Sequence, residues 1–223
     1  MTLNARAQTL SQGHEMMVKE VLRHGYDLTD ENGSVTRESE AIMLTVQHPD
    51  QDPRVHPLNQ IKGQALDQYA HDLIYGGVND EKFDYTYWRR LFRYGADHPD
   101  QEQVDQFALM IEKLNEAPTT RRAQAITWDP RRDPQVSEVP CLQMIQATIR
   151  NNALNLKAVF RSNDILQAAG ANMYALVQLQ RELAAVLILP VGTYTHIALI
   201  PHIYLTRDQH EIPQWRDLTG VHS

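Results

Sequence analysis

The sequence has very little cysteine and no long apolar segment. Its one cysteine, Cys141, excludes an internal disulfide and fits a reducing cytoplasm. The longest apolar stretch, residues 183–190, is too short to cross a bilayer, and residues 1–10 lack the apolar core of a signal peptide. Acidic residues outnumber basic ones by 28 to 21. We therefore expect a cytoplasmic protein whose main partner is neither nucleic acid nor a membrane.

Length and composition indicate one folded unit. Apolar residues make up 42% of the 223 residues, which is enough to bury a core in a chain of this length. We find no internal repeat and no low-complexity segment. The sequence predicts a single catalytic domain spanning residues 1–223.

Apolar spacing predicts an α+β fold with helices packed on a mixed β-sheet. We expect helices at residues 9–24, 58–75, 103–114 and 165–189, the last interrupted near Gly170, and strands at residues 42–47, 123–128 and 193–199. Residues 141–162 predict two strands joined by a turn at residues 150–152, because apolar and other residues alternate along 154–160. Residues 27–40, 49–57 and 131–139 are predicted to be turns or loops.

Cys141 is the first candidate for chemistry, although a lone cysteine is more often a buried apolar residue. A cationic environment would lower the pKa of its thiol and make it a nucleophile. Arg121 and Arg122 precede it and Arg161 follows it. Arginine also binds phosphate through a planar set of donors, so one pocket could hold a thiolate and a phosphorylated substrate. The alternative is that these arginines are ordinary surface charges.

Three further side chains suit a nucleoside. His202 and Tyr204 are two residues apart on a predicted strand, so they share one face and could bind a sugar hydroxyl. They could equally satisfy each other in a partly buried position. Asn172 offers a donor and an acceptor side by side, which matches the O4 and N3–H edge of uracil, but it could also be an amide without a role.

These residues occur in one order and spacing that resembles the thymidylate synthase family. The family has a paired arginine, a Pro-Cys nucleophile, an Arg-Ser-x-Asp segment, a base-reading asparagine and a His-x-Tyr pair. The matching segments here are Arg121-Arg122, Pro140-Cys141, Arg161-Ser162-Asn163-Asp164, Asn172 and His202-Ile203-Tyr204. Tyr94-Gly95 and Val104-Asp105-Gln106 resemble two further family segments, and the likeness covers residues 60–211.

The resemblance implies a role for each matched residue. Cys141 would add to C6 of the pyrimidine, and C5 would then take a one-carbon unit from a methylene-pterin. The 5′-phosphate would be bound by Arg161 and Ser162, and by Arg121 and Arg122 of the second subunit in a homodimer with shared active sites. Asn172 would read the base, His202 and Tyr204 would hold the 3′-hydroxyl, and Asp164 would contact the pterin. Arg37 is a further candidate phosphate ligand, and no metal is implied.

The chain departs from the family pattern on the pterin and acid–base side. Leu142 stands where the family usually has histidine, and the family's catalytic glutamate is replaced by one of Asp67, Gln68 or Tyr69. The tail, residues 205–223, shows no likeness to the family's C-terminal lid. The base that removes the C5 proton stays open among Tyr87, Tyr94, Asp67 and water, and Tyr85, Tyr87 and Trp88 are candidates for lining the pterin site.

Three functions follow from the resemblance and its departures. The first is a thymidylate synthase that methylates dUMP, with methylenetetrahydrofolate or methylene-tetrahydromethanopterin as cosubstrate, since a short chain of this pattern resembles the compact archaeal branch of the family. The second is a hydroxymethylase acting on dUMP, dCMP or CMP, in which water attacks the C5 methylene. The third is a non-catalytic nucleotide-binding relative.

Overall fold

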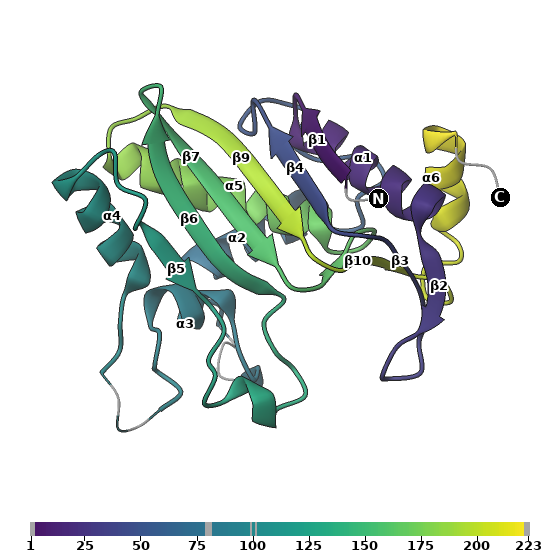
Figure 1. Ribbon diagram of the computed structural model, residues 1–223, viewed down its shortest axis with the longest axis horizontal. Helices are drawn as coiled ribbons and strands as arrows, with labels where there is room; N and C mark the ends of the chain where they lie inside the picture. The colour runs from purple at the N-terminus through teal and green to yellow at the C-terminus, as the bar shows by residue number, and fades with distance from the viewer. Residues whose placement is uncertain (1–2, 79–81, 99, 101, 221–223) are drawn as a thin grey trace.

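The computed structural model describes residues 3–78, 82–98, 100 and 102–220. The first two residues of the N-terminal segment and the last three of the tail therefore lie outside it. Its main element is a six-stranded sheet in which β1 pairs with β4 and β7 with β9 in parallel, while the other pairs are antiparallel (Figure 1). The order is β1 (Leu3–Ala7), β4 (Ile42–Val46), β9 (Val191–Ala198), β7 (Ala153–Phe160), β6 (Leu142–Arg150) and β5 (Gln124–Ile126). The predicted mixed sheet in an α+β fold is thus confirmed.

The hairpin of β6 and β7 forms at the predicted position in the sequence. Its turn holds Asn151 and Asn152 at positive φ angles of 52° and 55°, a conformation that asparagine tolerates better than most residues. Along β7, buried residues alternate with partly exposed ones, which is the pattern expected of a strand with one buried face.

A second sheet has four short strands in the order β2 (Tyr26–Thr29), β3 (Val35–Glu38), β10 (Pro201–Tyr204) and β8 (Asn163–Asp164). The prediction of a turn region over residues 27–40 is therefore wrong for its ends, which form β2 and β3. Only the middle is a turn, where the Asp30 carboxylate accepts hydrogen bonds from the backbone N–H groups of Asn32 and Ser34. The strands form because β3 pairs with β10, a partner distant in sequence.

The described residues form six α-helices: α1 (Leu10–His24), α2 (Gly63–Tyr75), α3 (Tyr87–Phe92), α4 (Gln106–Glu116), α5 (Ala169–Val186) and α6 (Ile212–Thr219). α1 begins as predicted, with the Thr9 hydroxyl capping the first turn. α2 begins five residues later than predicted. α5 is shorter than predicted and begins at Ala169, so the interruption expected near Gly170 coincides with its N-terminal end. The absent side chain of Gly170 leaves room there for Asn59 and His14.

The helices leave one face of the large sheet open. α5 packs against β7 and β9, and α1 packs against β1 and β4, so Leu44, Leu156 and Phe160 are buried beneath them. On the opposite face, no helix of the described residues lies over β4, β9, β7 and β6 (Figure 1).

The predicted surface loop at residues 131–139 is irregular but partly buried. It contains a short 3-10 turn at Asp133–Gln135. The Asp133 carboxylate is fully buried and forms an ion pair with Arg90 of α3 at 2.6 Å. This pair fixes the loop against α3, since a buried carboxylate requires a charged or hydrogen-bonding partner.

Candidate active site

Cys141 lies immediately before β6, and Arg161 lies immediately after β7, at the same end of the hairpin. The backbone N–H of Arg161 donates to the carbonyl oxygen of Cys141 at 2.8 Å. Its guanidinium reaches back along the same segment, where Nε donates to Pro140 at 3.0 Å and Nη2 donates to Val139 at 3.1 Å. Arg161 therefore holds the backbone that carries the thiol.

The thiol of Cys141 is half-buried, and burial raises its pKa above the ordinary value. Arg161 lowers the pKa, as the sequence predicted, whereas Glu138 and Asp164 raise it further. The expectation that arginines would favour the thiolate thus holds for the direction of the Arg161 effect but not for the net result. At neutral pH the thiol of the unliganded protein is therefore protonated.

Ser162 and His202 meet beside this segment. β8 pairs in parallel with β10, which places Asp164 opposite His202. The Ser162 hydroxyl lies 3.3 Å from Nδ1 of His202, and Nδ1 also lies 3.2 Å from the Ile200 carbonyl. Because a carbonyl only accepts, Nδ1 carries a proton in this arrangement and Nε2 is left to meet a ligand.

Tyr204 and Asp164 complete this side of the site. The Tyr204 ring packs edge-on against His202, with 5.1 Å between ring centroids. The Asp164 carboxylate accepts from the backbone N–H of Gln167 at 3.0 Å and pairs with Arg207 at 2.7 Å. Arg207 also lies over the Tyr204 ring at 4.4 Å, a cation–π contact that links the two residues.

Asn172 of α5 connects this group to α2. Its side-chain oxygen accepts from Nδ2 of Asn163 at 3.2 Å, and its Nδ2 donates to the Tyr69 hydroxyl at 2.7 Å. Asn172 is buried, so these bonds fix the rotation of its amide. The sequence named Tyr69 only as one of three residues near the position of the family's glutamate, and the contact with Asn172 distinguishes it from Asp67 and Gln68.

Three tyrosines lie near Cys141. The Tyr87 hydroxyl accepts a hydrogen bond from the backbone N–H of Leu142 at 3.2 Å, and its ring lies 5.7 Å from that of Tyr85. Burial raises the pKa of Tyr85 to about 12 and also raises the pKa values of Tyr69 and Tyr87, and a charge on Cys141 would add to each shift. All three phenols are protonated at neutral pH and are therefore donors rather than bases.

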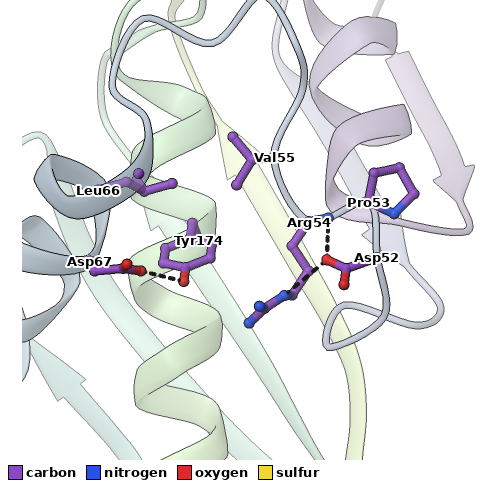
Figure 2. A pocket seen from close by; sticks show the side chains of 8 residues that line it. Asp52, Pro53, Arg54, Val55, Leu66, Asp67 and Tyr174 are labelled. Carbon is purple, nitrogen blue, oxygen red and sulfur yellow. Dashed lines mark hydrogen bonds and ion pairs between the residues drawn. The ribbon is translucent and has the colours of Figure 1, made fainter.

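The other candidate bases lie in different surroundings. The Tyr94 hydroxyl donates to the Trp128 carbonyl at 2.8 Å. Asp67 accepts from the Tyr174 hydroxyl at 2.8 Å in a shallow hollow that also includes Arg54 and Asp52, as Figure 2 shows. The lining of this hollow includes none of the residues predicted to bind substrate. Of the side chains named as candidate bases, only Tyr87 lies beside Cys141, and it is protonated.

The structure does not bring Arg121 and Arg122 to this group. Both side chains are exposed just before β5, whose register with β6 pairs Gln124 with Gln146. That register puts residue 121 level with residue 149, which is about 25 Å from Cys141 at the usual rise of a strand.

Arg37 is also outside the group. Its guanidinium pairs with Asp27 at 2.6 Å and donates to the Leu22 carbonyl at 3.2 Å. Arg37 is paired with Ile203 in the small sheet, so its side chain shares a face with Ile203 and not with His202 or Tyr204.

Within the described ranges, no cluster of histidine, cysteine or acidic residues has the arrangement of a metal site. Among the helices of those ranges, none is both long enough and apolar enough to cross a membrane.

Comparisons with known proteins identify the family of the chain. The family model described as thymidylate synthase matches residues 49–214, a span that contains the predicted site residues other than Arg37. The fold and this match define the class of protein: the chain belongs to the thymidylate synthase family.

Individual relatives cover nearly the whole chain. A protein of Methanosarcina acetivorans is 36% identical over 199 residues, 89% of this chain and 88% of its own. One of Methanocaldococcus jannaschii is 37% identical over 200 residues, 86% of each chain, and one of Methanothermobacter thermautotrophicus is 30% identical over 232 residues, 96% of this chain and all of its own. Each is provisionally named a thymidylate synthase.

Proposed function

We propose that this protein is a thymidylate synthase that converts dUMP to dTMP, with residues 1–223 acting as one catalytic unit. One observation carries the proposal: residues from four separate segments of the chain lie in one connected group at one end of the sheet. These residues are Cys141, Arg161, Ser162, Asp164, Asn172, His202 and Tyr204. Family membership supplies the reaction class, a one-carbon transfer.

In the proposed reaction the Cys141 sulfur bonds to C6 of uracil and the electrons of the C5–C6 double bond move toward C5 and O4. The thiol proton leaves as this bond forms, and C5 becomes the nucleophile. Arg161 has three N–H groups beyond those it donates to Val139 and Pro140, and these bind the 5′-phosphate. Nε2 of His202 and the Tyr204 hydroxyl hold the 3′-hydroxyl.

The carbon donor is a methylene-pterin, which supplies the one-carbon unit and the reducing equivalents when bound. Asp164 fits a role in holding it. A carboxylate has about four lone-pair positions, and Asp164 uses one toward Gln167 and one toward Arg207. The remaining positions accept N–H groups of a pterin ring. Tyr85 and Tyr87 are near enough to Cys141 to contribute an aromatic wall.

A hydroxymethylase is the second candidate function, and the position of the described part of the tail supports it. Residues 212–219 form α6, which packs against α1. Trp215 is fully buried there and stacks on His56 at 4.4 Å. A tail held in this way supports the fold and is not free to exclude water from the site, and water is the co-reactant that would give a hydroxymethyl product.

Product analysis tests the proposal. The purified protein is incubated with dUMP, dCMP or CMP and each of the two methylene-pterins, and the nucleotide product is identified by mass spectrometry. We expect a methyl product from dUMP together with the oxidised dihydro-pterin. A hydroxymethyl product would assign the second function, and failure to convert any nucleotide with either pterin would contradict both.

We also propose a homodimer that forms through the open face of the large sheet. Met43, Val159 and Ile197 lie side by side on this face, because β4 and β7 both pair with β9 in the matching register. Met43 is 38% exposed although it is in the second strand of the sheet. Arg121 lies on the same side of the sheet. Its backbone carbonyl accepts a hydrogen bond from the side chain of Gln146, which is on the open face of β6. A second subunit packed there would bring its Arg121 and Arg122 to a site that the first subunit's own pair cannot reach.

Mixing inactive variants tests this shared site. Cys141→Ser alone and the double variant Arg121→Glu/Arg122→Glu alone are both expected to be inactive. In a heterodimer of the two, one site receives Cys141 from one subunit and the arginine pair from the other. Equal mixing with subunit exchange should therefore restore roughly a quarter of wild-type activity. As the control, Cys141→Ser mixed with Arg161→Ala should stay inactive, because Cys141 and Arg161 act from the same subunit. Recovery of activity in this control mixture and not in the test mixture would contradict the shared site.

A further inference from the structure

A continuous hydrogen-bond chain runs from the core of the large sheet to the candidate site. The Tyr194 hydroxyl lies 3.0 Å from Nδ1 of His196, and Nε2 of His196 lies 2.8 Å from Oδ1 of Asn163. Nδ2 of Asn163 is 3.2 Å from Oδ1 of Asn172, whose Nδ2 is 2.7 Å from the hydroxyl of Tyr69. The chain therefore joins β9, β8, α5 and α2 and ends at the tyrosine closest to Asn172.

The hydrogen bonds of this chain all run in one donor-to-acceptor direction. His196 is fully buried, and burial lowers its pKa to about 3, so its ring is neutral and carries a single N–H. Tyr194 is also fully buried, and within the described part of the chain its hydroxyl has no acceptor other than His196. A buried hydroxyl hydrogen without an acceptor is costly. Tyr194 therefore donates to Nδ1, and the His196 proton is on Nε2.

Each following bond then has a fixed donor. Nε2–H of His196 donates to the Asn163 oxygen, and the Asn163 amide donates to the Asn172 oxygen. Asn172 in turn donates to the Tyr69 oxygen. The Tyr69 hydroxyl thus accepts from within the protein, and its own hydrogen remains available. Tyr69 is bonded to Asn172, and the partner of Asn172, Asn163, lies between Ser162 and Asp164, so this donor belongs to the candidate site.

We infer that this chain fixes Tyr69 as a hydrogen-bond donor to the 4-position of the bound pyrimidine and so selects uracil over cytosine nucleotides. The inference rests on the proposed nucleotide function. Uracil has a carbonyl oxygen at this position, whereas cytosine has an amino group that would meet a second donor. When Cys141 adds to C6, negative charge develops on O4, and the Tyr69 donor stabilises that charge without accepting a proton from C5.

Binding measurements with two nucleotides test the inference. Tyr69→Phe keeps the ring of a half-buried residue and removes only the hydroxyl. We expect its Kd for dUMP to rise about tenfold while its Kd for dCMP changes less than twofold. Tyr194→Phe tests a positioning residue, because the loss of its hydroxyl frees His196 to take the other tautomer. As in Tyr69→Phe, the Kd for dCMP divided by the Kd for dUMP should fall. Tyr174→Phe, on the same helix as Asn172 but bonded to Asp67, is the matched control and should leave the ratio unchanged.

The donor-to-acceptor direction of these hydrogen bonds can be measured separately, through the tautomer of His196. Nitrogen-15 chemical shifts of His196 should report the Nε2–H tautomer in the wild-type protein and its loss in Tyr194→Phe. An Nδ1–H tautomer in the wild type, or equal weakening of dUMP and dCMP binding in Tyr69→Phe, would overturn the inference. A wild-type protein that prefers dCMP would overturn it while leaving the nucleotide function in place. A protein that binds neither nucleotide would overturn the proposed function as well.

Discussion

Replacing Cys141 with serine is expected to reduce turnover of dUMP at least about 1,000-fold. Serine keeps the shape and hydrogen-bonding capacity of the side chain, but its hydroxyl ionises at a much higher pH and is a far weaker nucleophile toward C6. The nucleotide contacts assigned to Arg161, Ser162 and His202 do not include the thiol, so the Kd of dUMP should stay within about twofold of wild type. Turnover measured by product formation and Kd measured by calorimetry separate the two effects.

Reversible blocking of the thiol provides an independent control for this substitution. Because Cys141 is the only cysteine in the sequence, a methanethiosulfonate reagent can modify one side chain alone. Activity should be lost on modification and should return on treatment with dithiothreitol, and bound dUMP should slow the modification. Retention of turnover in Cys141→Ser, or in the fully modified protein, would contradict nucleophilic catalysis by this residue.

Acidification is expected to destabilise the protein through two buried histidines. Burial lowers the pKa of His14 to about 4 and the pKa of His196 to about 3, against about 6.5 in an unfolded chain. Since the folded pKa is the lower one, the unfolded state binds more protons below pH 6.5, and stability is lost as the pH falls toward the folded pKa. Between pH 7.5 and pH 5 each histidine should lower the free energy of unfolding by about 2 kcal/mol, or about 4 kcal/mol together.

Urea unfolding at the two pH values, at one fixed protein concentration, measures this loss. His14→Gln keeps a donor for the Ile165 carbonyl, which Nε2 of His14 contacts at 2.7 Å. This variant should be less stable than wild type at pH 7.5, but its further loss at pH 5 should be about 2 kcal/mol smaller. His48→Gln, at an exposed position, is the matched control and should lose as much as wild type. An unchanged pH dependence in His14→Gln would show that His14 is not buried as a neutral ring.

The sequence predicted most of the elements that repeat an apolar period within a single segment. α1, α4, β4 and the β6–β7 hairpin are found near their predicted positions, because a helical or alternating pattern is a local property of the chain. The predictions failed where a distant partner decides the conformation. β2 and β3 form in a stretch predicted as a turn region, since β3 pairs with β10 far along the chain. α5 begins four residues later than predicted, because the backbone N–H of Ile165 donates to the carbonyl of His202 in β10.

For the candidate site, the sequence by itself indicated the candidate residues and the order in which they occur. Cys141, the segment from Arg161 to Asp164, and His202 with Tyr204 are short motifs that can be identified without knowledge of the fold. Their spacing also indicated the family to which the chain belongs.

Only the tertiary structure decided how these residues act on one another. It showed that burial outweighs Arg161 in setting the pKa of Cys141. It also showed that Arg121, which precedes β5, lies too far from Cys141 to serve the site of its own chain. It also paired Asn172 with Tyr69, which is 103 residues away, and thereby gave the amide a fixed orientation. Solvent exposure and hydrogen-bond partners depend on segments that meet only when the chain folds, so no local pattern contains them.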